Sequence, residues 1–350
     1  MASAPPPPPS ASFASDNAAG VSPAVMDALA EANRGPALAY GDDPWTAAAI
    51  ANLQDRFEAP VEVQLCWGGT GANIVALATL LQPWQSILTV DSAHIVVDEA
   101  GGPARFTGST ITTVAHQRGK LVPEAVEPFL GWSGNEHRAQ PRVVSVSQAT
   151  EMGTVYTVDE LGALADRCHA HGLLLHVDGA RIANALAATG STLTEMIRDT
   201  GVDVLSFGMT KNGAMYGDAV VHLRPELAEH ARFVRKQAAQ LVSKSRFVAA
   251  QLTALLHDDL WLRNAAHANA LAQRLAHQVA NVPGIEIMSP PEVNSVFARI
   301  PWDRLDDLMA WSFFWPWEPA NHTVRWMTSF ATTTDDVDAF ASGVSQILGP

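Results

Sequence analysis

Two short apolar runs, each followed at once by a reactive side chain, constrain the fold of this chain more than any other feature. The first, Leu173–Val177, ends at Asp178, and the second, Asp203–Phe207, leads into a small-residue turn that holds Lys211. Apolar runs of this length, bounded by glycine, are typical of buried strands in a parallel sheet. Because ligands bind beyond the carboxyl ends of such strands, we expect the carboxylate and the amine in one crevice.

A carboxylate and a lysine amine in one crevice are the groups that a protein needs to hold pyridoxal phosphate. The amine forms a Schiff base with the aldehyde, and the carboxylate keeps the ring nitrogen protonated, so that the ring accepts electrons. A carboxylate about 4 Å from a cationic nitrogen gains roughly 4 kcal/mol at an effective dielectric of about 20. The alternatives are structural: Asp178 as the N-cap of a helix and Lys211 as an exposed turn residue.

Length and composition bound the domain organisation and the partners. A chain of 350 residues that is 47% hydrophobic and 17% charged is long enough for two domains. We predict a disordered proline-rich tail at 1–12, a large cofactor-binding domain with its N-terminal segment at 13–245, and a small C-terminal domain at 246–350. The net charge of −14 argues against nucleic acid or an anionic membrane as a partner.

Cysteine usage and hydropathy favour a cytoplasmic location. Cys66 and Cys168 are the only cysteines, too few for a disulfide framework or a metal cluster, so we expect two free thiols and no metal site. The chain contains no run of about 18 apolar residues, and its N-terminus lacks the pattern of a secretory signal.

The order of strand and helix patterns predicts the fold class. Up to about residue 223, helices near 23–33, 44–58, 72–81 and 158–171 alternate with strands near 61–66, 86–90, 110–114, 142–147, 173–177 and 203–207. This alternation indicates an α/β fold with a mainly parallel sheet and helices on both faces. Later residues predict a smaller α+β domain, with long helices at 226–256 and 258–280, short strands near 284–288, 295–300 and 323–328, and a last helix near 335–347.

A glycine-rich turn and a histidine add two candidates to the site. Gly69, Thr70 and Gly71 lie between a predicted strand and a helix, where backbone N–H groups and the helix dipole favour a phosphate. A tight strand–helix turn without a ligand would have the same pattern. His94 follows the strand at 86–90, and its imidazole is either a structural group or one that stacks on a flat ring.

These residues lie within a larger set of motifs that resembles the low-specificity L-threonine aldolases. These are fold-type-I pyridoxal-phosphate enzymes, grouped with the β-eliminating lyases. The matching motifs occur in family order over roughly residues 12–340: Phe13–Asn17, Tyr40–Asp43, Gly69–Asn73, Ser92–His94 with Asp98–Gly101, Ser147–Thr150 with Gly153–Tyr156, His176–Arg181, Ser206–Phe207 with Thr210–Gly213, and Val324–Met327.

The resemblance implies roles for matching positions around the cofactor. Lys211 would carry the Schiff base, Asp178 would face the ring nitrogen, and His94 would stack on the ring. The phosphate would be held by Gly69, Thr70 and Gly71. Arg181 would also lie near the ring hydroxyl.

The resemblance also implies how the substrate is held. Ser15, Arg181 and Arg325 would bind the substrate carboxylate, and His137 would point at its hydroxyl. Tyr40 belongs to a loop that in this family reaches a neighbouring subunit's site, which implies a homodimer or homotetramer with shared active sites.

The implied reaction is cleavage of L-threonine, L-allo-threonine or a related β-hydroxy-α-amino acid to glycine and an aldehyde. His94, His137 and an ordered water are candidate bases. One alternative is another pyridoxal-phosphate lyase that eliminates a β-substituent, and a second is a protein of this fold that binds without turnover. The aromatic segment Trp311–Trp317 is either core of the small domain or part of the substrate entrance.

Overall fold

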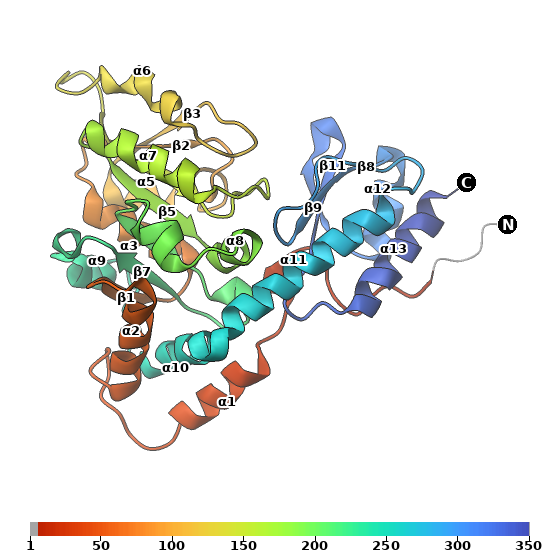
Figure 1. The fold of residues 1–350 in the computed structure, drawn as a ribbon, viewed down its shortest axis with the longest axis horizontal. Coiled ribbons are helices and arrows are strands. Elements are labelled where there is room, and N and C mark those ends of the chain that lie inside the picture. The colour runs from red at the N-terminus through yellow and green to blue at the C-terminus, as the bar shows by residue number, and fades with distance from the viewer. Residues whose placement is uncertain (1–5, 350) are drawn as a thin grey trace.

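The computed structural model describes residues 6–349, and a seven-stranded sheet forms the centre of the larger of its two lobes (Figure 1). The strand order is β1-β7-β6-β5-β4-β2-β3. β7 is antiparallel to both of its neighbours, and every other pairing in the sheet is parallel. The strands are β1 (Glu62–Cys66), β2 (Gln85–Val90), β3 (Thr110–Val114), β4 (Gln140–Ser147), β5 (Leu174–Gly179), β6 (Val204–Phe207) and β7 (Asp218–His222).

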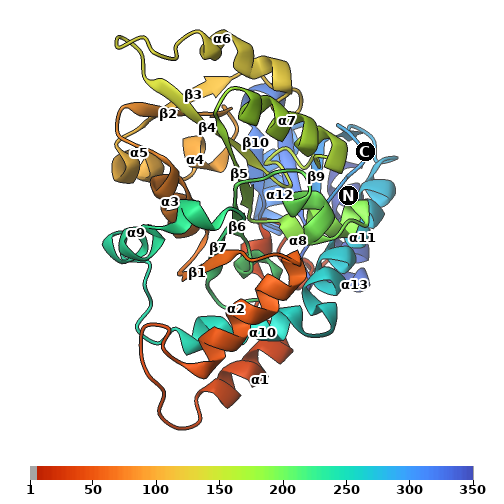
Figure 2. The ribbon, with the colours of Figure 1, turned by 60° about the vertical axis from the view of Figure 1, so that its left-hand side comes forward.

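Helices cover both faces of this sheet, which confirms the predicted fold class. In Figure 2, α3, α5 and α9 lie on one side of the sheet and α7 and α8 on the other. We call this sheet and its helices the large lobe. Its helices are α1 (Pro23–Ala32), α2 (Pro44–Phe57), α3 (Gly69–Leu80), α4 (His94–Val97), α5 (Gly102–Thr107), α6 (Glu127–Leu130), α7 (Val158–Ala170), α8 (Ile182–Thr189), α9 (Ala231–Gln237) and α10 (Arg246–Leu256).

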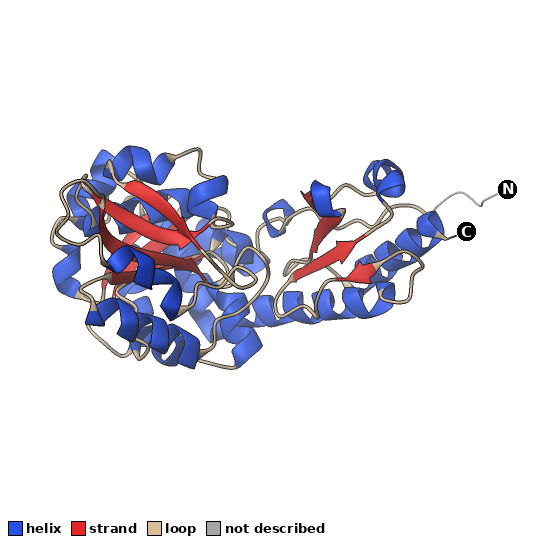
Figure 3. Cartoon of the chain, turned by 90° about the horizontal axis from the view of Figure 1, so that it is seen from above, coloured by secondary structure: helices blue, strands red, loops and turns tan. Residues whose placement is uncertain are grey.

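A second, antiparallel sheet builds the small lobe, as Figure 3 shows. Its strand order is β10-β11-β9-β8. One long helix, α11, begins in the core of the large lobe at Trp261 and ends in the core of the small lobe at Val279. The elements are α11 (Leu260–Val279), β8 (Glu286–Ile287), β9 (Ser295–Arg299), α12 (Leu305–Trp311), β10 (Trp315–Glu318), β11 (Thr323–Met327) and α13 (Thr334–Leu348).

The core of the large lobe extends beyond the predicted boundary at residue 245. Helix α10 buries Val248, Leu252 and Leu256 in the same core as the seven-stranded sheet. The sequence shows a change to long helices near this point. It does not show that α10 packs against the helices of the large lobe. The predicted boundary therefore falls at the start of a helix that belongs to the large lobe.

The N-terminal segment belongs in part to the small lobe. Residues 1–5 of the predicted tail lie outside the described residues. In the rest of the tail, Ser10 donates from both its amide and its hydroxyl to Asp336, at 3.1 and 2.7 Å. Phe13 is fully buried and stacks on Phe340, with ring centroids 4.2 Å apart. Residues 10–12 thus depart from the expected disordered tail, because Asp336 offers acceptors that composition does not reveal.

The helix predicted at 158–171 is present as α7, but one strand was not predicted and one predicted helix is broken. Thr157 and Glu160 form a reciprocal capping box at the start of α7. The strand β7 was not predicted. The helix predicted at 226–256 is interrupted between α9 and α10, where Ala239 has a φ of 58° that no helix continues. Alanine-rich composition alone does not signal such a break.

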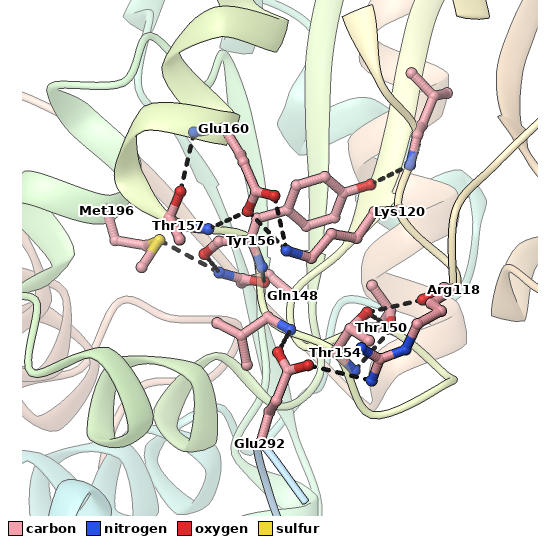
Figure 4. A network of polar contacts seen from close by, with 12 residues as sticks. Arg118, Lys120, Gln148, Thr150, Thr154, Tyr156, Thr157, Glu160, Met196 and Glu292 are labelled. Atoms are coloured by element: carbon pink, nitrogen blue, oxygen red, sulfur yellow. Dashed lines mark hydrogen bonds and ion pairs between the residues drawn. The ribbon is translucent and has the colours of Figure 1, made fainter. Parts of the chain in front are cut away.

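A polar network joins the two lobes beside the large sheet. Glu292, from the loop before β9, accepts the Val155 N–H at 2.8 Å and pairs with Arg118 at 3.3 Å (Figure 4). Val155 follows the Gly153 turn after β4. This network therefore fixes the small lobe against the segment that follows a central strand.

Among residues 6–349, no helix is both long enough and apolar enough to cross a membrane.

Candidate active site

The register of the large sheet brings polar side chains together at one edge. Ser147 is paired with Asp178, and Asp178 with Ser206, at the carboxyl ends of β4, β5 and β6. A cavity of ≈ 410 Å³ opens at this edge. The predicted residues that line it are Gly69, Thr70, His94, Asp178, Arg181 and Lys211.

Asp178 is held at the end of β5 by two donors. Its Oδ1 accepts the Ala180 N–H at 3.0 Å, and its Oδ2 accepts Nδ2 of Asn73 at 2.7 Å. The side chain is nearly buried but still lines the cavity. The carboxylate is therefore fixed in direction, as a group that must face one atom of a ligand requires.

Lys211 lies in a short 3-10 turn, Thr210–Asn212, just after β6. Burial lowers the pKa of its amine, and the charge of Arg181 lowers it further, against the opposing charges of Asp16, Asp178 and Asp218. A lysine with a lowered pKa has a larger fraction of neutral, nucleophilic amine at neutral pH.

Asp218 reaches the same edge because β7 is antiparallel, so its first residue lies beside the last residues of β1 and β6. The carboxylate accepts the Met209 N–H at 2.6 Å and the Thr210 N–H at 3.3 Å, and so holds the turn that carries Lys211. Burial raises the pKa of Asp218 to about 6.

The glycine-rich turn forms the amino end of α3. The first helical donor is the Ala72 N–H, bonded to the Gly68 carbonyl at 2.9 Å, so the N–H groups of the preceding residues have no partner inside the helix. Gly71 packs against Gln240 from the α9–α10 loop, and a Cβ at Gly71 would lie 2.0 Å from Gln240 Oε1. A side chain at position 71 would therefore have to displace the Gln240 amide.

His94 is fixed at both its backbone and its ring. Its N–H donates to Glu151 Oε1 at 2.9 Å, and its Nδ1 lies 2.8 Å from Glu99 Oε1. The hydrogen bond to Glu99 raises the pKa of the imidazole, although burial opposes this. With Nδ1 engaged, Nε2 is the ring nitrogen left for a ligand.

Glu151 is a buried carboxyl that lines the cavity. It accepts the Ser147 hydroxyl at 2.6 Å, and burial raises its pKa.

The two arginines expected at the substrate carboxylate differ in their surroundings. Arg181 makes a bidentate pair with buried Asp16, at 2.7 Å from Nε and 2.9 Å from Nη2. Burial by itself would raise the Asp16 pKa, but the charge and hydrogen bonds of Arg181 lower it to about 2. Most of the charge of Arg181 is therefore already balanced by the protein.

Arg325, on β11 of the small lobe, has no ion pair within residues 6–349. Its guanidinium stacks 4.5 Å from the ring centroid of Trp317, and its Nε is buried without a partner. Burial and the charge of Arg181 lower its pKa to about 10. Within the described residues, Arg325 is therefore a cation without a counter-ion, and it lies near the charged residues of the site.

Part of the aromatic segment is core of the small lobe. Phe314 is fully buried in the small-lobe core, whereas Trp317 stacks on Arg325.

Five predicted site residues do not line this cavity in the single chain: Gly71 and Arg325, described above, and Ser15, Tyr40 and His137. The hydroxyl of Ser15 accepts the Asn17 N–H at 3.1 Å. Tyr40 is 51% exposed, and its N–H donates to the Ser243 carbonyl. His137 is exposed and precedes the amino end of β4, whereas the cavity lies at the carboxyl end. Their roles stay predictions.

Sequence reasoning missed the residues that support the site. Asn73, Glu99 and Glu151 occur in the quoted motifs or directly beside them, but nothing in their spacing shows their partners. Asp218 was missed because an antiparallel β7 was not predicted. Asp16 lies in the Phe13–Asn17 motif, yet its pair with Arg181 joins residues far apart in the chain.

The donor set of this cavity fits pyridoxal phosphate. The amino end of α3 offers free N–H groups for a phosphate, Asp178 offers a fixed carboxylate for a ring nitrogen, and Lys211 offers an amine of lowered pKa for the aldehyde.

Comparisons with known proteins agree with this fit. A family model described as "Beta-eliminating lyase" matches residues 12–301. The chain is 42% identical over 340 residues to the low specificity L-threonine aldolase of Pseudomonas aeruginosa. This alignment covers 96% of this chain and 98% of that protein. The chain is 30% identical to the low specificity L-threonine aldolase of Saccharomyces cerevisiae, over 81% of this chain and 72% of that protein. The structure of a Leishmania major threonine aldolase superposes with a TM-score of 0.89 at 30% identity, and covers 94% of this chain and 97% of that one.

Proposed function

The chain belongs to the β-eliminating lyase family, and from this membership we propose that it is an L-threonine aldolase that depends on pyridoxal phosphate. It cleaves L-threonine, L-allo-threonine and related β-hydroxy-α-amino acids to glycine and an aldehyde. The observation that carries this proposal is one cavity that holds Lys211, Asp178 and His94 in a chain that aligns with L-threonine aldolases along most of its length.

When bound, pyridoxal phosphate supplies an electron-withdrawing ring for the electron pair of the bond that breaks. Lys211 would hold its aldehyde, and the amino end of α3 at Gly69, Thr70 and Gly71 would hold its phosphate. His94 would lie against the ring. Asp178 would keep a proton on the ring nitrogen, since a fixed carboxylate stabilises the protonated form.

We assign the substrate carboxylate first to Arg325. A desolvated guanidinium without an ion pair gains more from an incoming carboxylate than one that is already paired. Arg181, held by Asp16, would complete the anion site from the large lobe, and Ser15 would lie beside it. The amino-acid substrate would then be held between the two lobes.

The proton of the β-hydroxyl has three candidate acceptors. His94 offers Nε2, because its Nδ1 is engaged by Glu99. His137 and an ordered water are the others.

Tyr40 and His137 lie away from the cavity of their own chain, so their roles require a neighbouring subunit. We propose a homodimer or homotetramer with shared active sites. Exposed apolar side chains near the cavity support this: Trp67 is 47% exposed and lines the cavity, and Met215, next to the cavity residue Tyr216, is 45% exposed.

We also propose a cytoplasmic location. Both cysteines are free and buried, and burial raises their pKa values to about 12. Thiols with such raised pKa values are unreactive and form no disulfide, which is compatible with a reducing compartment.

Product analysis tests the proposed reaction. Purified protein with added pyridoxal phosphate is incubated with L-threonine or L-allo-threonine, and aldehyde and glycine are both quantified. Equal amounts of the two are expected, and Lys211→Ala should abolish them while the protein remains folded. Release of ammonia and a keto acid in their place would mean a β-eliminating lyase and would contradict the proposal.

A further inference from the structure

Asn73 bridges two carboxylates at the wall of the cavity, which it lines together with Asp178 and His94. It lies near the amino end of α3 and is 1% exposed. Its Nδ2 donates to Asp178 Oδ2 at 2.7 Å and to Glu99 Oε1 at 2.8 Å. Because both partners are acceptors, the orientation of the amide follows from the contacts themselves.

The bridge continues to His94. The same Glu99 Oε1 that accepts from Asn73 lies 2.8 Å from His94 Nδ1. A continuous path of short contacts therefore runs from the imidazole through Glu99 and Asn73 to Asp178. Its two ends line the cavity, and Glu99 between them is 6% exposed.

The position carries a cost that a purely structural residue would avoid. The Oδ1 of Asn73 and the Oε2 of Glu99 are buried without a hydrogen-bond partner within residues 6–349. Buried polar atoms without partners disfavour folding. Two buried carboxylates that share one donor would repel each other if that donor were removed.

We propose that Asn73 is a positioning residue that holds Asp178 against the cofactor's ring nitrogen and, through Glu99, sets the orientation of His94. This inference rests on the proposed function for the roles of Asp178 and His94. It assigns a role to a residue that touches neither the broken bond nor the substrate carboxylate. Its effect is on cofactor affinity and on the proton held at the ring nitrogen.

The test uses Asn73→Leu, which keeps the number and branching of the side-chain heavy atoms and removes the donor. Asn184→Leu is the matched control, because Asn184 is also a buried helix asparagine whose Nδ2 donates, at 2.9 Å to Asn269, but it lies on α8 away from the cavity. Three quantities are measured: the dissociation constant of pyridoxal phosphate from the full-length protein, the apparent pKa of the visible cofactor band in a pH titration, and the thermal midpoint of the apoprotein.

We expect Asn73→Leu to weaken cofactor binding by about tenfold, the effect of a lost hydrogen bond to a charged group, and to shift the apparent pKa of the band. Asn184→Leu should change the thermal midpoint only. Wild-type affinity and an unshifted band in Asn73→Leu, or equal losses of affinity in both variants, would overturn the inference. If Asn73→Leu does not fold, Asn73→Ser is used in its place, since serine can donate to only one carboxylate. The cofactor dissociation constant and the apparent pKa of the band are then compared in the same way.

These measurements need no amino-acid substrate. A protein that releases no aldehyde from threonine but shows the shifted band would refute the proposed reaction and support the role of Asn73. Normal aldehyde release by the wild type, with an unshifted band in Asn73→Leu, would support the proposed reaction and refute the role of Asn73.

Discussion

The two arginines proposed for the substrate carboxylate have different electrostatic surroundings in this protein. Arg181 is neutralised by Asp16, whereas within residues 6–349 the partner of the Arg325 guanidinium is the face of Trp317. An aromatic face orients a guanidinium without satisfying its donors. The difference between the two residues is one of partners, which the sequence does not reveal.

Replacing Arg325 by alanine should weaken substrate binding and leave cofactor binding unchanged. A hydrogen-bonded carboxylate contributes about 1.5–3 kcal/mol, so KM for L-threonine should rise by about 10- to 100-fold. The check is steady-state kinetics together with a cofactor titration. The matched control is Arg299→Ala, on the adjacent strand β9, where Arg299 pairs with exposed Glu286. An unchanged KM in Arg325→Ala would place the substrate carboxylate elsewhere.

Asp16 should make the stability of the protein depend on acid pH. Its folded pKa of about 2 lies below the ordinary value of 3.8, so its contribution is complete above about pH 4 and is lost as pH falls toward 2. The difference corresponds to about 2 kcal/mol. Urea unfolding of the apoprotein between pH 5 and pH 2 should show a steeper loss in the wild type than in Asp16→Asn. Parallel curves would refute this linkage.

At the scale of elements, the contact between the α9–α10 loop and the amino end of α3 shapes the phosphate position. Gln240 accepts the Trp67 N–H at 3.1 Å and fills the space that a Cβ on Gly71 would need. The loop therefore covers the turn that is proposed to hold the phosphate.

Gly71→Ala should displace Gln240 and weaken cofactor binding severalfold. The double variant Gly71→Ala with Gln240→Ala should recover part of the affinity, because the added methyl group then has space. Gly162→Ala in α7, where no heavy atom lies within 4 Å of the added Cβ, is the control and should bind the cofactor normally. A double variant no better than the single one would show that the methyl group acts on the cofactor rather than through Gln240.

Local sequence patterns predicted most helices and strands of this fold. They could not predict which strands pair or which distant side chains meet. The Thr157 capping box and the apolar runs before Asp178 and Lys211 act within a few residues, so the sequence shows them directly. The antiparallel direction of β7 and the bridge from Asn73 to Glu99 depend on partners far along the chain. Family resemblance supplied candidate roles for Arg325 and His137, but not the state of their surroundings.

In the whole molecule, the proposed site would take its groups from both lobes. The groups that would hold the cofactor come from the large lobe, whereas Arg325 comes from the small lobe. Glu292 joins the lobes through Val155 and Arg118 (Figure 4). The position of Arg325 relative to Lys211 thus depends on contacts between lobes.

Glu292→Ala should raise KM for the amino acid severalfold and leave cofactor affinity unchanged. The physical reason is that Val155 loses its acceptor and the small lobe loses a contact that fixes its position. Glu286→Ala, which removes a carboxylate that pairs with Arg299 within the small lobe, is the matched control for kinetics and cofactor titration. A change in cofactor affinity with an unchanged KM would contradict this division between the lobes.

Lys211 is the residue proposed to hold the cofactor. Reduction of the holoenzyme with borohydride, followed by peptide mass spectrometry, tests this proposal directly, since the chain has only Lys120, Lys236 and Lys244 as other lysines. One pyridoxyl adduct is expected, on the peptide that contains Lys211, and none in Lys211→Ala. An adduct on another lysine, or none in the wild type, would contradict the proposal.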